Sequence, residues 1–259
     1  MKRAARLPIT VPVLAKFFAF SATRSRPERE RDTPFLALAT TAVHGLFRGG
    51  ELAKKPKYEL LQRKDITWHK EHFVIHLEAS KTDSERLGVD VTVWRTGTPV
   101  CPFRVMKEYF ESAPGKGLFD PLFQRARAPG TKAGRAKPIT YRQLLGWVKE
   151  MAGGVGFDMK RIGTHSLRIG GATTLAALGV RKEYIQILGR WRSDCYQVYL
   201  RLSGEHFRST AAKMANLFSE SASGSLFGAL SFEDALTVTI ENIDAASPVC
   251  DREVGGSRS

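Results

Sequence analysis

Cysteine is scarce in this sequence, and the three that are present lie far apart, at Cys101, Cys195 and Cys250. An odd number of widely separated cysteines suggests neither a disulfide framework nor a thiolate metal site, and it fits a reducing compartment. Long apolar runs are also missing, since none approaches the roughly 20 residues that span a bilayer. The apolar N-terminus is interrupted by Lys16 and by prolines, and no clean small-residue cleavage site follows it. We therefore expect neither a segment that spans a membrane nor a targeting peptide.

Negative charge is lacking through most of the chain and is concentrated at one end. The 259 residues carry a formal net charge of +14. Positions 220–259 hold seven acidic and two basic residues, so positions 1–219 hold 38 basic and 19 acidic ones, a net of +19. A body this basic points to a polyanionic partner, which leaves DNA, RNA or an anionic membrane surface open. A basic protein kept soluble by its charge is the unspecific alternative.

The pattern of apolar residues predicts a mainly helical protein with one small sheet. The run PFLALATTAVHGLF is apolar enough for a helix buried in the core. Short segments predict three antiparallel strands, at 65–68, 73–79 and 89–94. Periodicity and caps predict further helices at 11–20, 101–112, 140–153, 164–178, 181–188, 193–202 and 206–217.

Composition divides the chain into three parts. Residues 1–33 form an N-terminal segment, in which 21–32 is rich in Arg and Glu and is expected to be a solvated linker. Residues 34–219 form the basic body. Residues 220–259 form an acidic tail, in which we expect disorder and one weakly apolar patch, 231–243, that folds only on contact with something.

The most informative stretch is THSLRIGGATTLAALG, which begins at Thr164. His165 and Arg168 are three residues apart and are expected to share a helix face. Both stand in the first turn, where free backbone N–H groups and the helix dipole favour an anion. The pattern is typical of a phosphate site, although an ordinary polar first turn has the same composition.

Three other segments hold residues with chemical potential, each with a simpler structural explanation. GLFRGGEL places Arg48 after the apolar helix, where a surface turn is the plainer interpretation. Lys81 stands in ASKTD at a predicted strand end, and one lysine in a turn indicates nothing alone. LGRWRSDCYQVYLR holds Tyr196 and Tyr199 on one helix face, where tyrosines most often pack in a core.

Together these segments resemble the tyrosine recombinase (phage integrase) family. That family shows the same order: an arginine in a G-L-x-R-x-x-E-L segment, a lysine on a β-turn, H-x-x-R opening a helix, and then a tyrosine, here 31 residues after Arg168. The resemblance runs from about Leu7 to Leu217, and the ending most resembles recombinases of eukaryotic mobile elements, the Crypton and DIRS groups. It implies the tyrosine recombinase catalytic fold, α+β and mainly α, with a small three-stranded antiparallel sheet.

The resemblance also implies a role for each residue. Arg48 and Arg168 look like the pair that clamps the scissile phosphate, because guanidinium groups match its oxygens bidentately. Lys81 looks like the general acid for the departing 5′ oxygen, and His165 like the partner that handles the nucleophile's proton. Tyr199 looks like the nucleophile. No metal and no cofactor are expected, because the protein carries the positive charge itself.

This sequence departs from the family in two places. The family usually has His or Trp nine residues before the nucleophile, where this chain has Arg190 and then Trp191. We assign that catalytic role to Trp191, and we expect Arg190 and Arg201, like Arg48 and Arg168, to contact DNA. Only about 33 residues precede the body, too few for the family's N-terminal clamp domain. We therefore expect a fragment, a decayed element or a half-clamp completed by another protein.

The function that the resemblance implies is site-specific recombination of double-stranded DNA through a 3′-phosphotyrosyl intermediate, for integration or excision of a mobile element. Self-assembly into a tetrameric synapse is expected with it, in the nucleus if the source is eukaryotic and otherwise in the cytoplasm. The main alternative is a degenerate or domesticated recombinase that only binds DNA. A type IB topoisomerase and a helix-turn-helix repressor explain fewer of the motifs. His69, His72 and His76 invite a metal interpretation, but we expect them around a strand turn.

Overall fold

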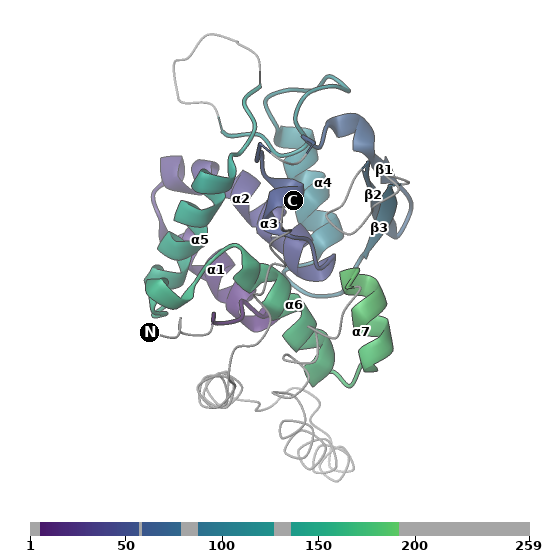
Figure 1. Ribbon diagram of the computed structural model, residues 1–259. Helices are drawn as coiled ribbons and strands as arrows, with labels where there is room; N and C mark the ends of the chain where they lie inside the picture. Colours follow the sequence, from purple (N-terminus) through teal and green to yellow (C-terminus); the bar gives the residue numbers. More distant parts are fainter. Residues whose placement is uncertain (1–5, 57–58, 79–87, 127–135, 192–259) are drawn as a thin grey trace, which may run out of the picture.

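The computed structural model describes residues 6–56, 59–78, 88–126 and 136–191. Helices make up most of this part, and a three-stranded sheet lies at one side of them (Figure 1). The predicted α+β, mainly helical class is therefore confirmed. The elements are α1 Val11–Thr23, α2 Arg26–His44, α3 Gly49–Leu52, η1 Arg63–Asp65, β1 Ile66–Trp68, β2 His72–Leu77, β3 Val89–Trp94, α4 Pro102–Ser112, α5 Tyr141–Gly154, η2 Met159–Arg161, α6 His165–Ala177 and α7 Lys182–Gly189.

The sheet has the order β1-β2-β3, and both pairings are antiparallel. Alternate residues of β2, namely Phe73, Ile75 and Leu77, are buried, because successive side chains of a strand point to opposite faces. Trp68 of β1 meets the ring of Phe103 in α4 edge-on, with 5.5 Å between ring centroids. One face of the sheet therefore packs on the helical core, and the three predicted strands are confirmed within one or two residues.

The segment 21–32 is not the solvated linker that its composition suggested. Helix α2 begins at Arg26 and runs through the rest of that segment into the apolar run. Asp32 is fully buried, and its carboxylate accepts hydrogen bonds from Ser21 Oγ (3.1 Å) and from Trp147 Nε1 of α5 (2.9 Å). The prediction was wrong because a segment rich in charged residues is expected to lie in solvent, whereas Asp32 is hydrogen-bonded inside the core.

The first helix belongs to the same core as the rest of the described chain. Ile9, Leu14 and Phe17 are fully buried, and the Phe17 ring meets Trp147 edge-on at 6.0 Å. The predicted boundary after residue 33 falls inside α2. No helix in the described ranges has the length and apolar character needed to cross a membrane.

Helix α6 approaches its neighbours very closely, and two glycines make this approach feasible. A Cβ on Gly170 would lie 1.8 Å from the carbonyl oxygen of Ile9, and one on Gly171 would lie 2.1 Å from that of Val43 in α2. Gly179, with φ +81°, follows the helix and turns the chain toward α7, as the sequence predicted. These contacts fix the start of α6, where two predicted site residues stand, against the end of α2.

We predict that Gly170→Ala lowers the free energy of unfolding by about 3 kcal/mol, because the new methyl group would clash with backbone that cannot move aside cheaply. The matched control is Gly146→Ala in α5, where a Cβ meets nothing within 4 Å. That change should stabilise the protein by about 0.5–1 kcal/mol, as expected for alanine in a helix. Urea unfolding of both variants tests the packing, and equal effects would contradict it.

Candidate active site

The start of α6 places one predicted site residue in solvent and the other in the interior. His165 is exposed, whereas Arg168 is 1% exposed. The Arg168 guanidinium donates hydrogen bonds to the carbonyl oxygens of Leu46 and Gly189. Arg168 is thus held between the turn after α2 and the end of α7, while His165 lies beside it in the same helical turn.

The turn after α2 brings the two predicted phosphate-binding arginines together. Leu46 has φ +50°, a left-handed backbone conformation that is uncommon for a residue with a side chain. Its carbonyl oxygen accepts from Arg168, and Arg48 follows two residues later. Arg168, which is remote in the sequence, is therefore bonded to the backbone of the turn that precedes Arg48.

Glu51 of α3 holds Arg48 in place, and the sequence analysis did not include it in the site. Its Oε1 accepts from Arg48 Nη1 at 2.9 Å, and its Oε2 accepts from the Arg48 backbone N–H at 2.8 Å. Burial alone would raise the pKa of Glu51, but the charges of Arg190 and Arg48 outweigh burial and hold this pKa below its ordinary value. The available signal was the spacing of the two residues in GLFRGGEL, because residues three apart face each other in a helical turn.

Close packing of α3 against α6 sets Arg48 beside the start of α6. A Cβ on Gly49 would lie 2.7 Å from Thr164 Cβ, so a larger residue would push the two segments apart. Thr164 Oγ1 donates to the hydroxyl of Tyr141 at 2.7 Å, which ties the same corner to α5. Lys55 Nζ lies 4.9 Å from the centre of the Tyr141 ring and adds positive charge to this corner.

Arg190 is largely buried in the structure. It follows α7, and its side chain is 10% exposed. Its Nη2 donates to Glu51 Oε2 at 3.0 Å, and the guanidinium lies 5.0 Å from the centre of the Phe47 ring. Its predicted contact with DNA stays a prediction.

Trp191 packs on Arg168. The guanidinium carbon of Arg168 lies 4.2 Å from the centre of the indole ring. Gly189 leaves room for the ring, since a Cβ there would lie 1.6 Å from an indole carbon. The structure thus places Trp191 next to a predicted phosphate ligand, and its predicted catalytic role stays a prediction.

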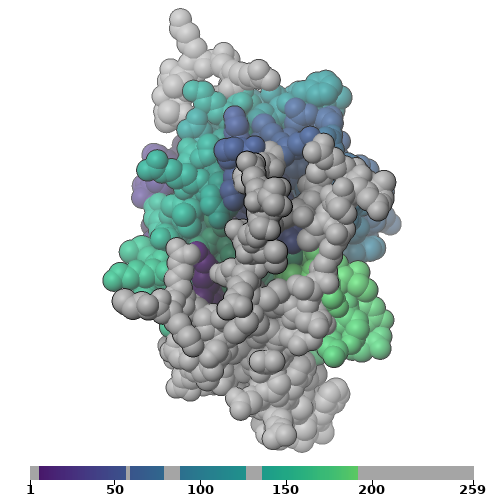
Figure 2. Space-filling model, in the orientation of Figure 1, coloured from purple at the N-terminus to yellow at the C-terminus, as the bar shows by residue number. Residues whose placement is uncertain are grey.

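The remaining predicted site residues lie outside the described part of the chain. Lys81 falls in 79–87, between β2 and β3. Tyr199, Tyr196 and Arg201 fall in 192–259. In the space-filling view, α7, the last described helix, lies at the lower right of the face that Figure 2 shows.

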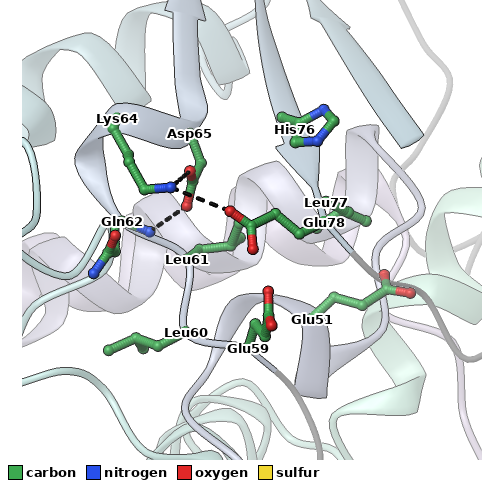
Figure 3. Close-up of a pocket in the computed structure, with 10 residues that line it drawn as sticks. All are labelled: Glu51, Glu59, Leu60, Leu61, Gln62, Lys64, Asp65, His76, Leu77 and Glu78. Atoms are coloured by element: carbon green, nitrogen blue, oxygen red, sulfur yellow. Dashed lines mark hydrogen bonds and ion pairs between the residues drawn. The ribbon is translucent and has the colours of Figure 1, made fainter. Parts of the chain in front are cut away.

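A cavity of about 290 Å³ lies between α3 and β2, and Glu51 is one of the residues that line it (Figure 3). Lys64 Nζ lies there, 3.1 Å from Glu78 Oε1 and 3.4 Å from Asp65 Oδ1. The hydrogen bond to Glu78 raises the pKa of Lys64, so this lysine retains its proton. Four carboxylates line this cavity and make it unsuited to a phosphate; they belong to Glu51, Glu59, Asp65 and Glu78.

The histidines of the sheet have partners other than a metal. The rings of His69 and His72 stack with their centroids 4.3 Å apart, and His76 Nδ1 lies 2.7 Å from Asp90 Oδ1. Among the residues that the structure describes, no group of three or more His, Cys, Asp or Glu is arranged to hold a metal ion.

We predict that Glu51→Gln lowers the free energy of unfolding at pH 7 by about 3 kcal/mol, because two buried guanidinium groups lose their anionic partner. The folded-state pKa of Glu51 lies below its ordinary value of 4.5, so its stabilisation is complete above that pH and is lost as the pH falls through the folded-state pKa. The difference between wild type and variant should therefore shrink below pH 4.5. Urea unfolding at several pH values measures it.

The control for Glu51→Gln is Glu71→Gln, since Glu71 is 54% exposed and pairs with Arg95 at the surface. That change should cost less than about 1 kcal/mol at any pH. Equal losses from the two variants, or a loss from Glu51→Gln that does not depend on pH, would contradict the account of the buried carboxylate.

Comparison with known proteins gives a structural likeness without a sequence match. No protein-family model matches the chain, and no curated protein matches it. Among solved structures, XerH site-specific recombinase bound to a palindromic difH substrate is similar with a TM-score of 0.56 at 19% identity, over 82% of this chain and 53% of that one. XerA recombinase is similar with a TM-score of 0.57 at 16% identity, over 81% and 64%.

A third structure, a lambda integrase dimer bound to a COC′ core site, has a TM-score of 0.50 at 15% identity, over 77% of this chain and 49% of that one. This chain thus spans between about half and two thirds of the length of these three proteins. The mainly helical body with its small three-stranded antiparallel sheet corresponds to one known architecture. The chain has the fold of the tyrosine recombinase catalytic domain.

Proposed function

We propose that this chain is the catalytic domain of a tyrosine recombinase, which cuts and rejoins double-stranded DNA through a 3′-phosphotyrosyl intermediate. The observation that carries the proposal is that Arg168 of α6 bonds to the Leu46 carbonyl, in the turn just before Arg48, while Arg48 pairs with Glu51. These are the two residues that the sequence assigns to the scissile phosphate. A fold shared with site-specific recombinases and a net charge of +19 over residues 1–219 support the same function.

The proposed chemistry needs only side chains of this protein. The Tyr199 oxygen attacks the phosphorus, the bond to the 5′ oxygen breaks, and Lys81 gives that oxygen a proton. His165 takes the proton of the nucleophile. The attack creates a phosphorane with extra negative charge, which Arg48 and Arg168 neutralise. Rejoining is the reverse reaction with a 5′ hydroxyl as nucleophile, so no net hydrolysis occurs.

The partners follow from this chemistry. Double-stranded DNA is the substrate, and a tetrameric assembly on DNA is part of the proposal. The ending LGRWRSDCYQVYLR supports a mobile-element recombinase of the Crypton or DIRS type, acting in integration or excision. XerH and lambda integrase, whose structures are similar, were each determined bound to a DNA site.

A nicked suicide duplex carrying the ends of the element tests the proposal, because loss of the short cleaved strand traps the covalent intermediate. Wild-type protein should form an adduct that resists denaturing electrophoresis. Tyr199→Phe should eliminate the adduct while DNA affinity stays within about twofold, since only one oxygen is removed. Tyr196→Phe, the matched control, should retain it. An adduct with Tyr199→Phe but not with Tyr196→Phe would reverse the assignment, and DNA binding without any wild-type adduct would favour the DNA-binding alternative.

The two arginines should act mainly on rate. Arg48→Ala and Arg168→Lys should each slow single-turnover cleavage by about 10²–10³-fold. Arg48→Ala removes a positive charge from the transition state, and Arg168→Lys keeps the charge but loses the bidentate contact of a guanidinium group. DNA affinity should change far less, since binding is spread over many phosphates. Arg26→Ala, at an arginine that is 84% exposed, is the control and should leave the rate unchanged. Cleavage at the wild-type rate by correctly folded Arg168→Lys would remove Arg168 from the site.

A further inference from the structure

Arg190 combines an unusual backbone conformation with an unusual environment. Its φ is +55°, and Leu46 is the other non-glycine residue with positive φ in the described part of the chain. The two residues meet, because Arg190 Nη2 lies 3.3 Å from the Leu46 carbonyl oxygen. Strained backbone of this kind persists only where the surroundings impose it, and it is concentrated at functional sites. The strain thus falls at the contact between Arg190 and the turn that carries Arg48.

The Arg190 guanidinium shares its partners with both predicted phosphate ligands. Glu51 accepts from Arg48 through Oε1 and from Arg190 through Oε2, and the Leu46 carbonyl accepts from both Arg168 and Arg190. Three guanidinium groups are therefore gathered around one turn and one carboxylate. The excess of positive charge in this cluster favours an anion.

One donor of Arg190 lacks an acceptor among the residues that the structure describes. Its buried Nε makes no hydrogen bond with them, and the side chain is 10% exposed. A buried N–H without an acceptor costs about 1–3 kcal/mol, so a site that retains one has a use for it. The Nη contacts to the carbonyl oxygens of Gly45 and Leu46, at 3.2 and 3.3 Å, are longer than usual hydrogen bonds. The guanidinium can therefore exchange them for a better acceptor while keeping its 3.0 Å bond to Glu51.

We propose that Arg190 is a third arginine of the catalytic site, which gives its Nε–H and its charge to a non-bridging oxygen of the scissile phosphodiester. The proposal rests on the proposed function and deepens it. Arg190 then acts on the phosphate under attack and not on DNA at the periphery, and Trp191 contributes by packing on Arg168. No bond to Arg190 forms or breaks, so its part in the reaction is to neutralise charge on the phosphorane.

The decisive comparison is between two suicide substrates, one with the natural scissile phosphate and one with a methylphosphonate at that position. The methylphosphonate lacks the negative charge on one non-bridging oxygen. On the natural substrate, Arg190→Ala should slow adduct formation by about 100-fold or more. On the methylphosphonate this defect should shrink at least tenfold, because the charge that Arg190 neutralises is gone. Equal defects on both substrates would assign Arg190 a structural role and overturn the proposal.

Two further variants protect the test against misfolding. Arg190→Lys keeps a positive charge beside Glu51 but lacks the planar fork, so it should fold, with an unchanged melting temperature, and should still be slow on the natural substrate. A wild-type rate for Arg190→Lys would overturn the proposal. Arg181→Ala is the matched control and should behave as wild type on both substrates. Arg181 is exposed, directly precedes α7 and donates to the hydroxyl of Tyr184. If the wild type forms no adduct with the natural phosphate, the proposed function itself fails, which is a different outcome.

Discussion

The buried carboxylate of Glu51 is the interaction on which the rest of the site depends. It is 3% exposed and accepts hydrogen bonds from Arg48 and Arg190 through different oxygens. Without this anion, guanidinium groups gathered in a poorly solvated corner would repel one another. With it, they are fixed at defined positions, so little reorganisation is needed when a phosphate arrives. A single negative charge thus makes a concentrated positive site compatible with a stable fold.

Close backbone packing supplies the second constraint. Gly170 and Gly171 let α6 lie directly on Ile9 and Val43, and Gly49 lets α3 lie against Thr164. Larger side chains at these positions would separate the start of α6 from the turn after α2. Uncharged backbone contacts therefore help Glu51 to position the charged groups. A larger side chain at one of these glycines would shift the charged groups without touching them.

Local patterns allowed much of this to be predicted from the sequence. The alternation in β2, the apolar run of α2 and the motif that opens α6 each depend on residues close together in the chain, and these elements were predicted correctly. Contacts between residues remote in the sequence could not be predicted. The segment 21–32 was predicted to be solvated because nothing in the sequence reveals that Asp32 pairs with Trp147. The inward position of Arg190 likewise depends on Glu51, which is remote in the sequence.

The central claim is that guanidinium groups from separate elements converge on one phosphate. A crystal structure of the Tyr199→Phe variant bound to a duplex with its target site tests this most directly, because the uncut phosphate is then seen in place. The account predicts guanidinium nitrogens of Arg48 and Arg168 within about 3 Å of oxygens of the same phosphate. Guanidinium groups bound to different phosphates, or still facing only protein carbonyls and Glu51, would contradict it.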